Sequence, residues 1–487
     1  MDISSRERTW YSVGLTLICL AALVALVEPL SLLFRVISRT YNEGWNAFWA
    51  DAAAHSGVLY MSGDSLIANN YPPLSFYVVG FVGRVVGDNV IAGRLVSLSS
   101  FAVIVAAAYL FLRAAGSSRR IAFTGAALIF AKFAFFAEIY VAMNDPQLLA
   151  HAFMLGALVV LWRLDFSPLA VIVGALLMLL GGFTKHLLIP LPVAVTLWIA
   201  IYRRERLVLW LACFAVGLPL GFWLVSSTWP SFVDELLSPR VYSLRRTVSA
   251  GLHAAFRFLP LLAVGLVPYF LRKRVPLSPR MVFALIYVVL ALAIGAFAAG
   301  GEGVTRNAFF DLLFASALLA ALALEWMFEH SREQRFLGLS ASPAVMTAFG
   351  VAMTVSAIVS VPSIVQGVRA LDAREQDTRE AVELIQRLGQ GRAACETLAL
   401  CYWARGPFTI DFFNYGQKLR TGALPVETCE AAFQRGEYPV LQLDAEHRKR
   451  GDRLWQCAPA IRRYYTEALR SSVGSIWVPK QQQVAGL

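Results

Sequence analysis

Residues 10–46 read WYSVGLTLICLAALVALVEPLSLLFRVISRTYNEGWN, and this stretch decides the fold. Its first part, 10–34, is an apolar run of the length that crosses a bilayer as a helix. A polar segment follows, with Asn42 and Glu43 a few residues beyond the run. The pattern predicts a membrane protein with a carboxylate at the mouth of its first span, beside both lipid and water.

The composition of the whole chain supports this prediction. Of its 487 residues, 58% are hydrophobic and 15% are charged, and the mean hydropathy is +0.60. Soluble domains carry about 25% charged residues, so the composition excludes a soluble class. We expect 10–34 to remain as a span, because it is too long for the apolar core of a signal peptide and has no clear small-residue cleavage site.

Apolar runs of roughly 17–25 residues, or shorter ones where a helix tilts or breaks, are the units that cross a bilayer. The sequence predicts about eleven of them. They are 10–34, 89–112, 121–141, 147–163, 168–183, 187–202, 207–227, 258–271, 281–299, 307–326 and 341–363. The predicted fold class is an α-helical polytopic membrane protein with a small C-terminal α/β domain.

The net charge of +11 follows from this topology. Basic residues gather in every second connection: Arg113, Arg119, Arg120, Arg203, Arg204, Arg206, Arg272, Lys273, Arg274 and Arg280. Such an excess is typical of cytoplasmic loops. A cytoplasmic N-terminus and an odd number of spans put the C-terminus outside, and we expect no nucleic-acid binding.

The longest outer segment, 35–88, contains the polar motif. Within it, Trp45, Phe48 and Trp49 recur at helical spacing, which favours a helix lying in the membrane interface. The sequence Tyr71-Pro72-Pro73 then ends any helix and turns the chain back towards the membrane.

The composition changes near residue 364. The charged segment 372–389 is typical of a helix that ends at its glycine. We predict two domains, a transmembrane domain over 1–363 and an outer α/β domain over 364–487, which is an ordinary domain size.

Four cysteines fall in the predicted outer domain. An even set there indicates disulfides, and proximity favours Cys395–Cys401 and Cys429–Cys457. The other two pairings remain open. A zinc site is the alternative, although no CxxC motif supports it.

Three acidic residues are candidates for chemistry on the outer side. Glu43 lies just past the first span, where a carboxylate can take a proton from an acceptor hydroxyl. Asp145, in a short turn, can cap the next helix, position an acceptor or hold a divalent cation together with Glu43. Glu138, one to two turns earlier, is the third candidate. A divalent cation is the one cofactor that the sequence raises.

Lys185 and the adjacent His186 lie at the outer end of two short predicted spans. An ammonium there can neutralise a phosphate group. The alternative is a lysine that extends to the membrane interface without binding a substrate.

Three arginines in outer segments, Arg245, Arg246 and Arg306, run against the positive-inside trend and invite an anionic partner. The alternative is pairing with acidic neighbours in the same loops. Lys132 lies within a predicted span, where a charge is costly and often functional.

In this order along the chain, the motifs resemble the GT-C superfamily of integral membrane glycosyltransferases, which use polyprenyl-phosphate sugars. The sequence looks most similar to the bacterial branch of lipid A aminoarabinose transferases, rhizobial galacturonosyltransferases and protein mannosyltransferase-like enzymes. Asn42-Glu43-Gly44 matches the family's acidic motif after the first span, and Tyr71-Pro72-Pro73-Leu74 matches its Pro-containing segment. The resemblance covers roughly residues 10–325.

Two further motifs carry the resemblance. Asp145 matches the family's second acid, and Thr184-Lys185 matches a Thr-Lys motif implicated in binding the lipid phosphate. The chain departs from the family at His186, where many members have glycine. It also departs at Phe310-Asp311-Leu312, where members often have Tyr-Leu-Pro.

The resemblance implies an inverting glycosyltransferase, either a hexosyl- or a pentosyltransferase, at the outer face of a bacterial inner membrane. It would move a sugar from a polyprenyl-phosphate donor to a cell-envelope acceptor, which is a glycolipid, a polysaccharide or a protein. The residues assigned are Glu43 and Asp145 for catalysis, Lys185, Arg245, Arg246 and Arg306 for the donor phosphate, and Asn42, Trp45, Tyr71, His186 and Glu138 for substrate binding.

Two other functional classes fit part of the pattern. A transporter or flippase for lipid-linked sugars would also use outer cations and aromatic residues, but near the bilayer midplane on broken helices. A noncatalytic assembly subunit with a receptor-like tail is the other class, and the set Glu43, Asp145 and Lys185 argues against it.

Overall fold

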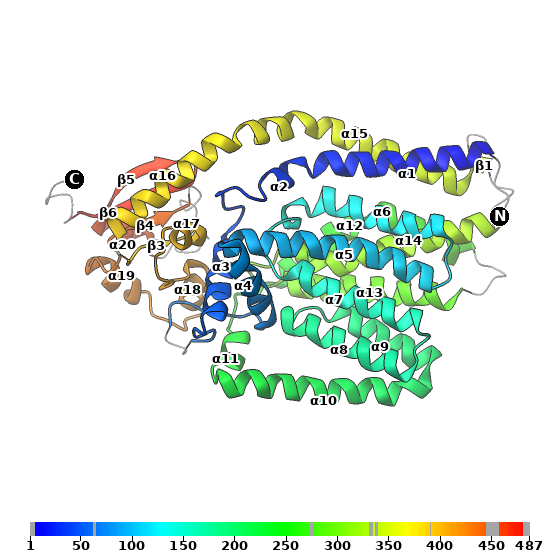
Figure 1. The fold of residues 1–487 in the computed structure, drawn as a ribbon, viewed down its shortest axis with the longest axis horizontal. Coiled ribbons are helices and arrows are strands. Elements are labelled where there is room, and N and C mark those ends of the chain that lie inside the picture. Colours follow the sequence, from blue (N-terminus) through cyan, green and yellow to red (C-terminus); the bar gives the residue numbers. More distant parts are fainter. Residues whose placement is uncertain are drawn as a thin grey trace.

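The computed structural model describes residues 5–61, 65–271, 277–330, 335–336, 339–389, 391–444 and 457–480. Long helices lie side by side in a bundle, and a small mixed α/β domain lies at one end of it (Figure 1). We call this end of the bundle the domain end. The N-terminus of α1 lies at the opposite end.

The bundle is built from helices, nearly all of which contribute apolar residues to one continuous core. They are α1 (Ser5–Ala25), α2 (Val27–Ser31), α5 (Asn89–Ala114), α6 (Arg119–Phe136), α7 (Gln147–Arg163), α8 (Pro168–Thr184), α9 (Pro190–Tyr202), α10 (Arg204–Thr228), α12 (Leu244–Leu271), α13 (Pro279–Ala299), α14 (Phe310–His330) and α15 (Ala341–Arg369). In the described part of the chain, 7 helices are long and apolar enough to cross a membrane, so the chain is an integral membrane protein.

Every predicted span coincides with helices of this set, whereas the number that crosses the bilayer stays a prediction. The boundary of one span was wrong. The run 258–271 is only the second half of α12, so much of the predicted loop 228–257 is helical and Arg245 and Arg246 lie in the first turn of α12. Hydropathy alone missed this half because exposed polar residues interrupt its apolar pattern.

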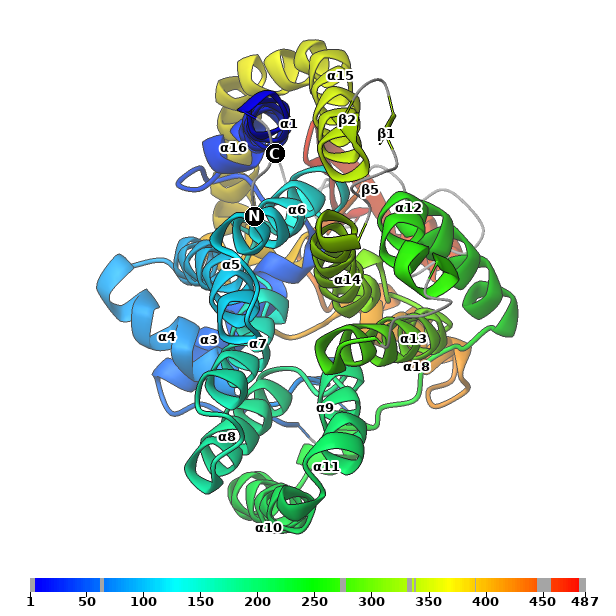
Figure 2. The same cartoon turned by 90° about the vertical axis from the view of Figure 1, so that its right-hand side faces the viewer.

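The helix α14 forms the centre of the bundle, with α6, α12 and α13 around it (Figure 2). In the most apolar 18-residue segment of this helix 89% of the residues are buried, whereas the corresponding share for α10, at the edge of the bundle, is 6%. A helix that is apolar on all sides suits this central position.

Between the bundle and the C-terminal domain lie two further helices, α3 (Tyr41–Ala54) and α4 (Leu74–Val86) (Figure 1). The prediction of a helix at α3 is confirmed, whereas α4 was not predicted. Trp45 and Trp49 do not face lipid as an interfacial helix would require. They are buried against protein, where the ring of Trp45 contacts Tyr71 and Phe76.

The C-terminal domain places helices around a four-stranded sheet of order β3-β4-β6-β5. β3 and β4 are parallel, and the other pairs are antiparallel. Its elements are α16 (Leu371–Gly389), β3 (Ala394–Cys395), α17 (Leu398–Trp403), α18 (Phe412–Arg420), α19 (Glu427–Gln434), β4 (Leu441–Leu443), α20 (Ala458–Tyr464), β5 (Tyr465–Ser471) and β6 (Gly474–Pro479). The predicted helix 372–389 and the α/β character are confirmed. α15 runs on through the predicted domain boundary at 363, which stays a prediction.

The short elements that remain are the helices α11 (Phe232–Leu236), η1 (Glu138–Tyr140) and η2 (Arg306–Phe309) and a hairpin of β1 (Arg335–Phe336) and β2 (Leu339–Ser340). η1 and η2 lie at the domain end, where they carry residues of the candidate site.

The predicted disulfide Cys395–Cys401 is confirmed. Cys457 is also disulfide-bonded. The side chain of its predicted partner, Cys429, lies outside the described residues, so that pairing stays a prediction.

Candidate active site

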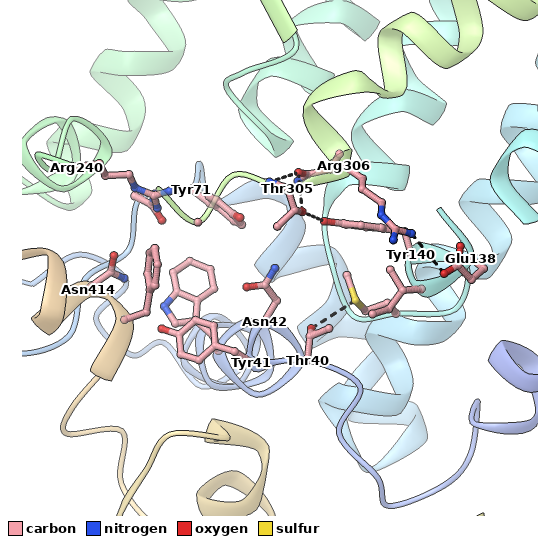
Figure 3. A pocket seen from close by; sticks show the side chains of 17 residues that line it. Thr40, Tyr41, Asn42, Tyr71, Glu138, Tyr140, Arg240, Thr305, Arg306 and Asn414 are labelled. Carbon is pink, nitrogen blue, oxygen red and sulfur yellow. Dashed lines mark hydrogen bonds and ion pairs between the residues drawn. The ribbon is translucent and has the colours of Figure 1, made fainter. Parts of the chain in front are cut away.

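A cavity of about 490 Å³ lies at the domain end of the bundle (Figure 3). Arg240 and Asn414 lie at one end of it, and Arg306 and Glu138 lie at the other. Its walls come from α3, the segment at 70–71, η1, the segment at 303–307 and α18: Thr40, Tyr41, Asn42, Trp45, Asn70, Tyr71, Glu138, Ile139, Tyr140, Met143, Arg240, Gly303, Thr305, Arg306, Asn307, Phe413 and Asn414. We call it the larger cavity.

A second cavity of about 290 Å³ adjoins the first and reaches Lys185 and His186 at the end of α8. We call it the smaller cavity. The two share the lining residues Asn70, Tyr71, Arg240, Gly303 and Asn307. A molecule bound in one cavity is therefore adjacent to a molecule bound in the other.

Lys185 is a buried cation beside the smaller cavity. Its Nζ lies 3.8 Å from Oδ1 of Asp145 and 3.9 Å from the ring centroid of Tyr71. Apart from its contact with Tyr71, it forms no hydrogen bond with any described residue. Burial lowers the pKa of Lys185, but the carboxylate of Asp145 contributes in the opposite direction and the net pKa is raised. The ammonium thus stays charged and keeps donors for a ligand.

The neighbours of Lys185 at the smaller cavity differ in charge. Burial, together with the charges of Lys185 and Arg240, lowers the pKa of His186 to about 4, so its imidazole is neutral at pH 7. Arg240, in the segment after α11, lines both cavities. Lys185 and Arg240 bring two positive charges to the smaller cavity, and Asp311 brings one carboxyl group. His186 adds a neutral polar group.

Asp145 lies beneath the cavity wall and is buried. Its Oδ1 accepts from the backbone N–H of Gln147 at 2.9 Å, as a helix cap does, and its Oδ2 accepts from Nδ2 of Asn42 at 3.3 Å. Asn42 lines the larger cavity, so Asp145 links the cavity wall to Lys185.

Glu43 does not line either cavity, although the sequence placed it at the mouth as a base. It is fully buried, and Arg94 of α5 donates to both of its oxygens, from Nε at 2.8 Å and from Nη2 at 2.7 Å. The backbone N–H groups of Arg39 and Asn144 add two more hydrogen bonds. Burial raises the pKa of Glu43, but Arg94 and these hydrogen bonds lower it by more, so the net pKa lies below its usual range. A carboxylate in this state is a weak base.

Glu43 and Asp145 do not fit a divalent cation. Both carboxylate oxygens of Glu43 already accept hydrogen bonds from Arg94 and from backbone N–H groups. These donors stand where a metal ion would have to bind. Among the described residues, no cluster of three or more histidine, cysteine, aspartate or glutamate side chains could hold a metal ion. We therefore assign no step to a metal.

Glu138 in η1 lines the larger cavity. Among the described residues, no other carboxylate lines this cavity. Its Oε1 lies 3.5 Å from Nη1 of Arg306, and its Oε2 has no hydrogen bond to a described residue. Beside it, the hydroxyls of Tyr140 and Thr305 are 2.6 Å apart. Of the acids predicted from the sequence, Glu138 is the one that faces an open volume.

The other predicted arginines lie apart from this site. Arg245 and Arg246 are exposed and line neither cavity, and Arg246 lies 4.0 Å from Glu302. Arg306 does line the larger cavity. Of the three arginines that the sequence placed in outer segments, one therefore lines a cavity.

The C-terminal domain forms part of the cavity wall through Phe413 and Asn414 of α18. Asp411, the buried cap of that helix, accepts hydrogen bonds from the hydroxyl of Tyr41 and, at 3.0 Å, from Nε1 of Trp45. The domain therefore fixes two aromatic side chains of the opposite wall.

Two glycines allow this close approach. A Cβ at Gly44 would lie 2.0 Å from the backbone nitrogen of Ala399 in α17. A Cβ at Gly303, which has φ +81°, would lie 2.3 Å from the ring of Phe413. The glycine after Glu43 is thus explained by packing of the C-terminal domain on α3.

Sequence reasoning missed Arg94, Arg240, Tyr140, Asp411 and Asn414. Arg94 lies within a predicted span, where a charge signals a function or a buried partner, and this signal was available. The others lie in segments without a motif, and only the fold brings them to the cavity.

No protein-family model matches the sequence, and no curated protein matches it. The solved structure of ArnT from Cupriavidus metallidurans in the apo state has a TM-score of 0.60 and 14% identity, over 95% of this chain and 97% of that chain. The structure of ArnT bound to undecaprenyl phosphate has a TM-score of 0.57 and 15% identity over the same shares. The chain thus has the fold of the GT-C glycosyltransferases.

Proposed function

We propose that this chain, which has the GT-C fold, transfers a sugar from a polyprenyl-phosphate donor to a cell-envelope acceptor, with inversion at the anomeric carbon. The observation that carries the proposal is Lys185. It is a buried, charged ammonium beside a cavity at the end of the bundle, and apart from its contacts with Asp145 and Tyr71 it has no partner among the described residues. Asp145 balances its charge at 3.8 Å, and the N–H groups that remain can donate to a phosphate oxygen.

The donor phosphate binds in the smaller cavity. Lys185 and Arg240 supply the positive charge, and Asn70 and Asn307 supply amides at the junction with the larger cavity. The structure of ArnT with undecaprenyl phosphate supports this class of ligand for the fold. The donor sugar then projects into the junction, since the phosphate is held on the other side.

The acceptor binds in the larger cavity. Tyr41, Trp45, Tyr71, Tyr140 and Phe413 give its wall aromatic faces. Aromatic faces combined with a few fixed polar groups are typical of pockets that orient a substrate. The acceptor can be a glycolipid, a polysaccharide or a protein hydroxyl.

The reaction is a displacement at the anomeric carbon. The acceptor oxygen forms a bond to that carbon while the bond from carbon to phosphate oxygen breaks, and the phosphate leaves with the electron pair. Lys185 and Arg240 stabilise the charge that develops on the leaving phosphate. The carboxylate of Glu138 takes the proton of the acceptor hydroxyl.

Asp145 and Glu43 act as positioning residues. Asp145 holds Lys185 on one side and Asn42 on the other. Glu43 holds Arg94, which donates to the backbone carbonyls of Leu32 and Ile37 at 2.7 and 2.5 Å, and so fixes the entry to α3.

The location we propose is the bacterial inner membrane, with the N-terminus in the cytoplasm and the C-terminal domain outside. The distribution of basic loops supports this orientation. It puts both cavities on the outer side, where a lipid carrier and cell-envelope acceptors meet.

Sugar transfer by the purified full-length chain in nanodiscs tests the proposal. A panel of radiolabelled polyprenyl-phosphate sugars is supplied with membrane-extracted acceptors, and the anomeric configuration of the product is measured. Transfer with inversion is the expected result. Retention of configuration, or movement of the lipid-linked sugar across the bilayer without transfer, would replace the proposal by another mechanism or by a flippase.

A further inference from the structure

A pair of cations lies outside both cavities, on the side of the bundle formed by α6 and α12. Nζ of Lys132 donates to the backbone carbonyl of Arg257 at 3.3 Å and lies 5.4 Å from the ring centroid of Phe258. Within the described part of the chain, neither Lys132 nor Arg257 forms an ion pair with a carboxylate. Both lie within helices of the bundle, α6 and α12.

The surface around this pair is apolar and open. On α12, Arg257 is exposed together with Leu252, Phe256 and Leu259, which are 68%, 76% and 53% exposed. Such a surface on a long apolar helix faces lipid in a membrane protein. We call Lys132, Arg257 and these three apolar side chains the α6–α12 surface.

The α6–α12 surface lies next to the larger cavity. Both helices pack on α14 (Figure 2). Phe136, at the end of α6, packs on Phe258 with ring centroids 5.0 Å apart, and its carbonyl accepts from Nη1 of Arg306 at 3.0 Å. Lys132 precedes Phe136 by one helical turn, roughly 6 Å along the helix. The pair therefore lies just below the level of the cavity.

Lys132 is half-buried and Arg257 is exposed, and a cation within a membrane helix that lacks a carboxylate partner is costly unless an anion or water reaches it. Two cations on neighbouring helices suit a dianion better than a monoanion. A phosphate monoester carries about −1.5 to −2 charges at pH 7. The phosphodiester of an ordinary phospholipid carries one. The charge thus favours a lipid that ends in a phosphate monoester.

We infer that the α6–α12 surface is a second docking site for polyprenyl phosphate, separate from the site at Lys185. The phosphate monoester contacts Lys132 and Arg257, and the prenyl chain lies along Leu252, Phe256 and Leu259. The inference rests on the proposed function for the identity of the lipid. It gives the released carrier a place beside the cavity after its sugar has been transferred.

Binding of undecaprenyl phosphate to the full chain tests this inference, with native mass spectrometry as the measurement. The Lys185→Gln background removes the cavity site and leaves the second one. Adding Lys132→Gln and Arg257→Gln should weaken the remaining binding by about tenfold or more, because two charge-assisted contacts are lost. Phosphatidylglycerol is the probe for an ordinary anionic lipid. It should bind more weakly than undecaprenyl phosphate, and its binding should change less when Lys132 and Arg257 are replaced.

Two controls keep the result interpretable. The charge-retaining variant with Lys132→Arg and Arg257→Lys should bind like its parent, which separates lost charge from lost folding. Arg163→Gln, on an exposed arginine at the other end of the bundle, should have no effect. Unchanged binding after both cations are neutralised, or equal competition by phosphatidylglycerol, would overturn the inference. A chain that binds the carrier at this surface but transfers no sugar would instead overturn the proposed function alone.

Discussion

Glu43 and Arg94 form a two-pronged ion pair in which neither side chain is exposed, with N–O distances of 2.8 and 2.7 Å. Arg94 extends from the second turn of α5 to the first turn of α3, and it also donates to three carbonyls between the first helix and α3. The pair therefore joins the bundle to the helix that lines the larger cavity.

Breaking this pair should unfold the site before it affects chemistry. Glu43→Gln leaves the Arg94 guanidinium buried without its counter-charge, which costs about 3–5 kcal/mol in comparable buried pairs. We expect a marked fall in the melting temperature, measured by tryptophan fluorescence in nanodiscs. Exposed Asp372→Asn, which breaks the surface pair with Arg35, is the control and should shift it little. A Glu43→Gln chain that melts normally yet transfers no sugar would return Glu43 to the role of base.

Glu138→Gln should remove catalysis without removing the fold. The glutamine keeps the size and polarity of the side chain but cannot take a proton, so kcat should fall about 10²–10⁴-fold. Binding of polyprenyl phosphate should persist, since Glu138 lines the larger cavity and not the smaller one. Steady-state kinetics and carrier binding are measured on the same preparation. Full activity in this variant would exclude Glu138 as the base.

Asp411→Asn should affect the acceptor more than the donor. Asparagine still caps α18, but it loses the charge that holds Tyr41 and Trp45. Hydrogen bonds to a charged group contribute about 1.5–3 kcal/mol, so the KM for the acceptor should rise roughly tenfold or more. The KM for the donor should stay within about twofold. Equal changes in both constants would mean that the domain only supports the fold.

The stability of the chain should fall as the pH rises towards neutrality because of Glu235. Burial raises the pKa of Glu235 from 4.5 to about 7, although the backbone N–H groups of Asn69 and Met61 and the charge of Lys418 oppose this. The folded state thus favours the protonated acid. Its contribution is fully present below the unfolded pKa and is lost as the pH rises through about 7.

Melting temperatures between about pH 5 and about pH 8 measure this effect. Glu235→Gln should flatten the curve, whereas Asp234→Asn, on the exposed neighbouring acid, should leave it unchanged. A curve in Glu235→Gln as steep as that of the unmodified chain would assign the pH dependence to another group.

Hydropathy predicted most of the fold because apolar length is a strong signal. The core of α14 and the positions of the other bundle helices follow from it, as does the separate α/β character after residue 364. The polar first half of α12 was missed because Arg245, Arg246 and Arg257 interrupt the apolar pattern that a span would need. α4 was missed because 74–86 is shorter than a span and follows two prolines.

The candidate site was predicted only in part. The sequence gives the position of a residue along the chain, but it does not give the direction in which the side chain points. Lys185, Arg306, Tyr71 and Asn42 do face the cavities. Glu43, one residue after Asn42, points the other way, towards Arg94. On a helix, adjacent residues differ by about 100° in direction, and no composition rule says which one faces the substrate.

The most direct test of the account is sugar transfer by the full chain in nanodiscs, with the wild type compared with Lys185→Gln. The account predicts transfer by the wild type and a loss of about 10²–10³-fold in kcat/KM in the variant, because the leaving phosphate loses its buried cation. Binding of polyprenyl phosphate should weaken in parallel. Transfer at the wild-type rate by Lys185→Gln would contradict the account, since the one observation on which the proposed function rests would then have no role in the reaction.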